Sequence, residues 1–231
     1  MIQKVQAEIV SSSRLTKTIW QYHIKPEHFI HYEPGQYLSV HINNKDWYYS
    51  IAEPASEKNY YELHIRQSLK QARAIDWKIG NRLELSLPYG NCTISKLQHK
   101  RPVIFIAAGM GYVPIRAMIK GLLAHYNSQK IELYWKVSNS EDLYDKNLLD
   151  CWLKNLQKFN FFPSISQTSK QNLTERIMAR HSHDLINWQV VMAGAFDLMY
   201  LQRDFLIKQG LGKNAIFSDA FEFEKEEVCP E

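Results

Sequence analysis

The chain has few cysteines, and their arrangement excludes several classes of protein. Only three occur in 231 residues, Cys92, Cys151 and Cys229, and no two of them form a Cys-x-x-Cys pair. An odd number of widely spaced cysteines does not make a disulfide framework, and zinc and iron–sulfur sites need thiol ligands at closer spacing. We therefore expect reduced thiols and no cysteine-based metal site.

Histidine is more frequent, but its close pairs lack the other ligands of a metal site. His28 and His31 flank a loop before Pro34, and His181 and His183 stand near the predicted end of a helix. Neither pair has a carboxylate or thiol at ligand spacing, so we expect no metal. No Gly-x-Ser-x-Gly nucleophile elbow is present either.

Long apolar runs and an excess of one charge are also absent. No run approaches the roughly 20 apolar residues that span a bilayer. The formal net charge is +4, with acidic and basic residues interspersed, which favours neither nucleic acid nor a membrane surface as partner. The first eight residues carry charges where a signal peptide needs an apolar core, so we expect a cytoplasmic protein.

The first 99 residues contain short runs of β-branched and aromatic residues. Between 37 and 42 polar and apolar residues alternate, as in a half-buried antiparallel strand. The strands we expect are 5–11, 16–24, 36–42, 47–52, 60–66 and 82–87, with one helical interruption at 69–79. Six such strands predict a small closed antiparallel β-barrel as a first domain, residues 1–99.

From residue 100 onward, strands alternate with helices. The expected strands are 103–107, 131–137, 160–165, 189–193 and 215–218, and the expected helices are 113–126, 141–159, 173–180 and 197–209. This alternation predicts a second domain, residues 100–231, built as a doubly wound parallel sheet that binds ligands beyond the carboxyl ends of its strands. We expect the acidic tail, 222–231, to be partly disordered.

The most informative stretch is the strand-to-helix corner at 104–114. An apolar run breaks into Gly109-Met110-Gly111 and restarts as a helix with Pro114 in its first turn. Glycines there allow a tight turn and let backbone N–H groups approach a pyrophosphate at the positive end of the helix. The alternative is an ordinary turn in which glycine only supplies a positive φ.

Five segments in order give the chain a family resemblance. They are Gly35-Gln-Tyr37, Trp47-Tyr-Tyr-Ser50, Leu87-Pro-Tyr-Gly90, Gly109-Met-Gly-Tyr-Val-Pro114 and Ala193-Gly-Ala-Phe-Asp-Leu-Met199. Together they resemble the ferredoxin reductase superfamily, most of all the short bacterial NAD(P)H:flavin oxidoreductases without an iron–sulfur domain. The ending Phe217-Ser-Asp-Ala-Phe221 resembles those flavin reductases specifically.

The resemblance implies hydride transfer from C4 of NADH or NADPH to N5 of a flavin, which can be FMN, FAD or riboflavin. Ser50 is the implied catalytic residue, acting by orientation and hydrogen bonding near N5 because the redox chemistry belongs to the flavin. From the residues alone, the preferred interpretation of Ser50 is a serine that caps the turn before Pro54. The implied flavin-side residues are Tyr37, Trp47, Tyr48, Tyr49, Ser50, Ile51 and His64. Tyr37, Tyr49 and Tyr89 suit a barrel core equally well.

The second domain is expected to hold the nicotinamide nucleotide. The implied contacts are Gly109, Met110, Gly111, Pro114, Gly194, Phe196 and Met199, and Phe221 is placed near the flavin as an aromatic lid. The serines and acidic residues at 138–142 offer no arginine for a 2′-phosphate, so we expect no strong preference for NADPH.

Three positions depart from the family pattern. Trp47 replaces an arginine that binds the phosphate or ribityl side of the flavin, and tryptophan cannot supply that charge. Met110 replaces a threonine, and Ala108 stands where a third glycine is frequent. The change at Trp47 puts the affinity for flavins, especially phosphorylated ones, in question, and the changes at Met110 and Ala108 predict looser or differently shaped contacts with the nicotinamide.

Three functions therefore stay open. The protein could reduce a diffusible flavin, it could retain its flavin and pass electrons to a partner protein or oxygenase, or it could bind a nucleotide without turnover. The colour of the purified protein separates the first two, because only a retained flavin makes it yellow.

Overall fold

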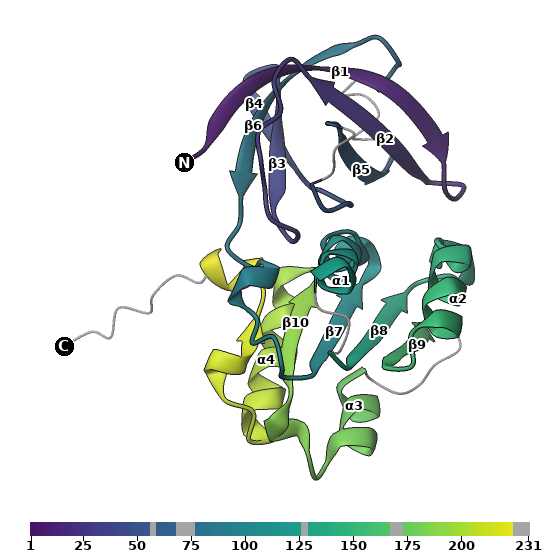
Figure 1. The fold of residues 1–231 in the computed structure, drawn as a ribbon, viewed down its shortest axis with the longest axis vertical. Coiled ribbons are helices and arrows are strands. Elements are labelled where there is room, and N and C mark those ends of the chain that lie inside the picture. Colours follow the sequence, from purple (N-terminus) through teal and green to yellow (C-terminus); the bar gives the residue numbers. More distant parts are fainter. Residues whose placement is uncertain (56–58, 68–76, 126–128, 167–172, 224–231) are drawn as a thin grey trace, which may run out of the picture.

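The computed structural model describes residues 1–55, 59–67, 77–125, 129–166 and 173–223. In Figure 1 an antiparallel sheet lies in the upper part of the molecule and a parallel sheet with its helices in the lower part. The upper sheet has six antiparallel strands in the order β4-β3-β6-β1-β2-β5. Their bounds are β1 Gln3–Arg14, β2 Ile19–Pro26, β3 Tyr37–Ile42, β4 Lys45–Ser50, β5 Tyr61–Arg66 and β6 Arg82–Tyr89. In β1, buried Val5, Ala7 and Ile9 alternate with exposed residues, which is the period of a strand with one face on a core.

The sheet curls into a barrel that is only partly closed. Its outermost strands, β4 and β5, meet at a single bridge between Ile51 and Leu63. The predicted closed barrel is therefore a half-barrel, because strand β4 ends at Ser50 and pairing with β5 is limited to this bridge and the adjoining bond from the Ala52 N–H to the Glu62 carbonyl.

The lower sheet is parallel, in the order β11-β10-β7-β8-β9. Its strands are β7 Val103–Ala108, β8 Ile131–Val137, β9 Phe159–Ile165, β10 Gln189–Ala193 and β11 Ile216–Phe217. The helices are α1 Tyr112–His125, α2 Lys146–Asn155, α3 Leu173–His181 and α4 Phe196–Lys208. Residues 103–107 of β7 are fully buried, as a central parallel strand covered on both faces requires. The predicted fold class, an antiparallel barrel followed by a doubly wound sheet, is confirmed.

Some predicted boundaries differ from the structure. A single helix over 141–159 is wrong: Ser140–Asp142 forms a 3₁₀ turn, and α2 begins only after Asp145, which adopts a left-handed conformation (φ 59°). The last strand has two residues instead of four. Most of the predicted helix 69–79 and of the tail 222–231 lies outside the described residues.

The two sheets share part of one hydrophobic core. Ile19, at the tip of the β1–β2 hairpin, is 1% exposed and belongs to the cluster that covers one face of the parallel sheet. The barrel interior and the other face of the parallel sheet form separate clusters. The hairpin thus fixes the barrel against the nucleotide-type domain.

Among the helices that the structure describes, none is long and apolar enough to cross a membrane. In the same residues no three His, Cys, Asp or Glu side chains gather as metal ligands.

Candidate active site

The strand-to-helix corner after β7 is built by two glycines with different tasks. Gly109 takes φ 55°, a left-handed conformation that favours glycine. A Cβ on Gly111 would overlap the carbonyl oxygen of Ala193, so only glycine lets this turn lie against the end of β10. Trp135 on β8 donates its indole N–H to the Gly109 carbonyl at 3.0 Å, which fixes the turn. The amino end of α1 therefore has a fixed position at the carboxyl edge of the sheet.

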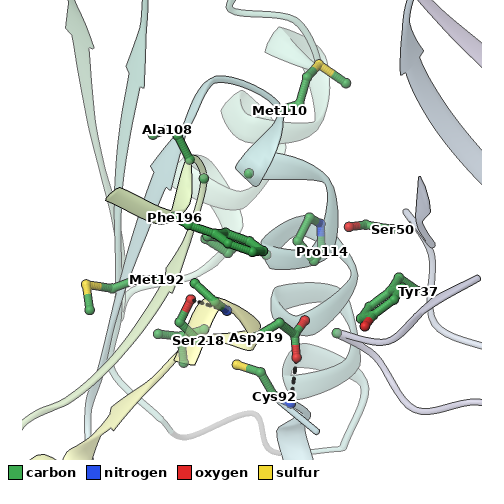
Figure 2. A pocket seen from close by; sticks show the side chains of 18 of the residues that line it. Tyr37, Ser50, Cys92, Ala108, Met110, Pro114, Met192, Phe196, Ser218 and Asp219 are labelled. Carbon is green, nitrogen blue, oxygen red and sulfur yellow. Dashed lines mark hydrogen bonds between the residues drawn. The ribbon is translucent and has the colours of Figure 1, made fainter. Parts of the chain in front are cut away.

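A cavity of about 840 Å³ lies between this corner and the barrel (Figure 2). Ser50 and Tyr37 enter it from the barrel, and Pro114, Phe196 and Asp219 face the same space from the other domain. The cavity thus brings together residues from both sheets, at the strand ends where parallel α/β sheets bind ligands.

Aromatic rings form the barrel side of this cavity. Tyr37 and Tyr89 stack with centroids 5.5 Å apart and planes 13° from parallel, and Tyr48 meets both edge-on. Ser50 is the register partner of Tyr37 across β3 and β4, which puts its hydroxyl beside this aromatic group. Burial, followed by the charge of Asp219, raises the pKa of Tyr37 to about 12, so its phenol stays neutral.

A second cavity of about 360 Å³ adjoins the first. Tyr48, Ser50 and Met110 line both cavities, so these three side chains form the passage between them. The polar groups of the second cavity include His64 and Arg66 of β5. His64 accepts or donates hydrogen bonds at both ring nitrogens, to Tyr144 at 3.1 Å and Glu62 at 2.9 Å, and so has a fixed orientation.

The structure brings together ten of the fifteen predicted site residues. The larger cavity is lined by Tyr37, Tyr48, Ser50, Met110, Gly111, Pro114, Gly194 and Phe196, and the smaller one adds Tyr49 and His64. The phenol oxygen of Tyr49 is buried without a hydrogen-bond partner in the described residues, and burial raises its pKa to about 12.

The other five predicted residues do not line either cavity. Ile51 is fully buried in the barrel core and Met199 in the core beside α4. Trp47 packs against the outside of the barrel core, with the Lys45 ammonium 4.4 Å from its ring centre. Gly109 shapes the turn through its backbone, and the Phe221 ring lies near Tyr200 instead of facing the cavity.

Phe223 occupies the place that the sequence assigned to Phe221. It lines the larger cavity and stacks on Phe196, with ring centroids 5.3 Å apart. Residues Asp219–Phe223 form a 3₁₀ turn, so the side chains of Phe221 and Phe223 point to different sides. The sequence motif alone does not reveal this turn.

Asp219 is a cavity residue that sequence reasoning missed. Its carboxylate accepts the Cys92 N–H at 3.1 Å, and Glu222 accepts the neighbouring Asn91 N–H at 2.7 Å. Burial, with Glu222 adding to it, raises the pKa of Asp219 to about 7. The only sign of its role in the sequence is its position inside the Phe217–Phe221 motif. Its hydrogen bond to Cys92 joins residues more than 120 positions apart and cannot be read from the motif.

These residues fit a flat aromatic ligand and a dinucleotide. The stacked tyrosines and Phe196 offer ring faces, Ser50 offers one hydroxyl, and Gly111 lines the cavity directly before the start of α1. A flavin would lie against the barrel wall at Ser50, and a nicotinamide nucleotide would lie against the glycine corner.

Comparisons with known proteins agree with this geometry. The family model for the oxidoreductase NAD-binding domain matches residues 105–204. The chain is 26% identical to a probable flavin reductase of Photobacterium leiognathi, a match that covers 96% of this chain and 97% of that protein. It is 24% identical to a CDP-6-deoxy-L-threo-D-glycero-4-hexulose-3-dehydrase reductase of Yersinia pestis, over 86% of this chain and 62% of that protein. The chain thus spans less than two thirds of that relative's length.

Among solved structures, the fold is similar to that of a cytochrome P450 reductase of Amycolatopsis. The TM-score is 0.84 at 18% identity, over 94% of this chain and 69% of that chain. At that identity the likeness shows the fold alone.

Proposed function

We propose that this chain, a member of the ferredoxin reductase-like superfamily of FAD- and NAD-binding proteins, reduces a diffusible flavin with NADH or NADPH. The single observation that carries the proposal is the shared cavity, which sets Ser50 and the tyrosines of the barrel opposite the glycine corner. Similarity to probable flavin reductases along nearly the whole chain supports the same reaction.

The chemistry of the bound pair is hydride transfer from nicotinamide C4 to flavin N5. Ser50 would orient the flavin by a hydrogen bond from its small hydroxyl, which leaves the ring face open to the hydride donor. Tyr37, Tyr48 and Phe196 would hold ring faces and exclude water. The reaction consumes one proton, and the Asp219 carboxyl, with a pKa of about 7, can hold one at neutral pH.

A second candidate is a reductase that retains its flavin and passes electrons to a partner protein. Two observations favour it. Tyr48, Phe196 and Phe223 are exposed large hydrophobic residues at the cavity, and two similar proteins are reductase components of terephthalate 1,2-dioxygenase. The third candidate, a nucleotide-binding relative without turnover, rests on Trp47 and Met110 at positions where the family has other residues.

An NADH-oxidation assay with riboflavin, FMN and FAD in parallel tests these alternatives. Colourless protein that oxidises NADH when free flavin is added is the expected result. A yellow stoichiometric complex would favour the second candidate, and the absence of both colour and turnover would favour the third.

A further inference from the structure

A buried arginine on α1 binds the barrel. Arg116, on α1, is 6% exposed. Its Nη1 donates to the Ala52 carbonyl at 2.8 Å and to Glu53 Oε1 at 2.6 Å, and lies 3.2 Å from Glu62 Oε1. Its Nε donates to Asp145 Oδ2 at 2.6 Å. One side chain of the nucleotide-type domain therefore binds three residues of the barrel.

These contacts make a short path from one wall of the cavity to the other. Ser50 lines the barrel wall, and Ala52 follows it by two residues; Pro114 lines the opposite wall, and Arg116 follows it by two residues. The bond from Arg116 to the Ala52 carbonyl closes this path. On its other side, the Ala52 N–H donates to the Glu62 carbonyl at 2.8 Å, so the segment after Ser50 is held from both directions.

We propose that Arg116 is a positioning residue, which sets the distance between the flavin at Ser50 and the nicotinamide at the glycine corner. The proposal rests on the proposed function. Hydride transfer requires donor and acceptor about 3 to 3.5 Å apart, and a misplacement of about 1 Å can slow such a step a hundredfold. A contact that fixes the two walls at this range affects the transfer step without touching either ligand.

The guanidinium is suited to this task in a way that lysine is not. Arg116 bonds in two directions at once, with Nη1 toward the barrel and Nε toward Asp145. The three carboxylates around it outweigh the effect of burial and raise the pKa of Arg116, so it stays charged. Lysine keeps the charge, but it has a single nitrogen and cannot reproduce the planar fork.

The test compares Arg116→Lys with two controls. Lys120→Met, one turn further on α1, removes a cation that also pairs with Glu53 but, within the described residues, makes no bond to the barrel backbone. Glu132→Gln removes a buried carboxylate from the ion pairs between β8 and α3, and so lowers stability far from the cavity. The measurements are steady-state and single-turnover reduction of riboflavin by NADH and by [4-²H]NADH, and amide hydrogen exchange of residues 50–53 without ligands.

We expect Arg116→Lys to slow hydride transfer about ten- to a hundredfold, with KM values for both substrates changed by less than about threefold. The deuterium isotope effect on kcat rises, and the Ala52 amide exchanges faster. Both controls keep the wild-type transfer rate and the wild-type exchange at 50–53. The proposal is overturned if Arg116→Lys transfers hydride at the wild-type rate, or if Glu132→Gln loses as much transfer rate as Arg116→Lys.

A second variant and the ligand-free exchange measurement cover the cases in which Arg116→Lys does not fold or the wild-type protein reduces no flavin. If Arg116→Lys does not fold, Glu53→Gln removes one barrel anchor while retaining Arg116; slower transfer or faster exchange at Ala52 supports the proposal, and no change in either overturns it. If the wild-type protein reduces no flavin, the proposed function fails, and unchanged exchange in Arg116→Lys then separately rejects the positioning role.

Discussion

Single side chains at the cavity owe their direction to strand pairing. Ser50 and Tyr37 are register partners in β3 and β4, and the chain continues from Ser50 into buried Ile51. A hydroxyl at the end of a strand, held between a neighbouring strand and a core residue, has little freedom to move. This is the geometry that a positioned hydrogen bond needs.

Replacing Ser50 by Ala should therefore slow hydride transfer more than it weakens flavin binding. The hydrogen bond matters most when bonding changes at the reacting atom, and loss of one such group costs about ten- to a hundredfold in rate. Stopped-flow reduction at saturating flavin gives the rate, and flavin titration gives the affinity. Wild-type rates combined with a lower Tm would remove Ser50 from the site.

A cation for the phosphate tail of a flavin would have to come from a residue other than Trp47, which carries no charge. Trp47 does not reach either cavity, and in the described residues the arginine that lines the smaller one is Arg66. Its Nη2 lies 3.1 Å from Asp142 Oδ1, so its charge is already partly satisfied. Riboflavin should consequently be used at least as well as FMN, since a phosphate gains little from a paired cation and must lose water.

Asp142→Asn should then shift the preference toward FMN. Freeing Arg66 offers the phosphate a charge-assisted hydrogen bond, which is worth about 1.5 kcal/mol, or roughly a tenfold change in relative kcat/KM. The neighbouring Glu141→Gln is the matched control, because Glu141 pairs with Lys17 outside this cavity. An unchanged ratio of FMN to riboflavin use in Asp142→Asn would show that Arg66 is not near the phosphate.

At the scale of elements, α3 is fastened to β8 by a buried ion pair. His181 Nε2 lies 2.8 Å from Glu132 Oε2, and His181 Nδ1 lies 3.0 Å from Asp184 Oδ1. Burial alone would lower the pKa of His181, but these hydrogen bonds outweigh it and raise that pKa. Burial would likewise raise the pKa of Glu132, yet hydrogen bonds from His181 and Tyr134 lower it to about 2.

His181→Gln should lower the free energy of unfolding by about 3 kcal/mol, because it leaves a buried carboxylate with fewer partners. The stabilisation from a raised histidine pKa is complete below the ordinary value of about 6.5 and disappears as pH rises through the folded value. That from the lowered Glu132 pKa is present above about 4.5 and is lost as pH falls toward 2.

Denaturant unfolding of both proteins from pH 3 to pH 9 measures this difference. The gap between wild type and His181→Gln should be widest between about pH 4.5 and 6.5, and should narrow on both sides. Exposed His183→Gln is the control and should leave the curve unchanged. A gap that does not vary with pH would mean that His181 contributes by packing alone.

The local sequence predicts these elements well where a pattern repeats within one segment. Alternation identified β3, runs of β-branched and aromatic residues identified the other barrel strands, and a continuous apolar run identified β7. The start of α2 was missed because Asp145 is held in a left-handed conformation by partners on α1, including Arg116. Periodicity carries no information about a contact made with another helix.

The same limit applies to the site. Ser50 and Gly111 could be found from motifs, because the residues of these motifs themselves line the cavity. Asp219 and Phe223 could not, because their place depends on how the last turn folds against the segment after β6. Residues whose role comes from contacts between distant segments become visible only in the folded chain.

Across the whole molecule, the segment after β8 is bound to the barrel at successive positions. Glu141 pairs with Lys17 at 2.9 Å, Asp142 with Arg66, and the Tyr144 hydroxyl with His64. Two unpaired carboxylates at this strand end would repel a 2′-phosphate. Since both are paired with cations of the barrel, that repulsion is weaker than the sequence alone implies.

We still expect NADH to be used as well as NADPH or better. In doubly wound domains the adenosine ribose lies near the end of this strand, and a 2′-phosphate there needs a cation, preferably arginine. Among the described residues, Lys17 and Arg66 are engaged with Glu141 and Asp142, and Lys136 on β8 itself is a further candidate. Ser138 and Asn139 can bind a ribose hydroxyl without any cation.

The ratio of kcat/KM for NADH and NADPH at fixed flavin measures the preference, and Lys136→Met should change this ratio little. A preference for NADPH above about tenfold, roughly 1.4 kcal/mol, would contradict this prediction, and its loss in Lys136→Met would identify that lysine as the phosphate ligand.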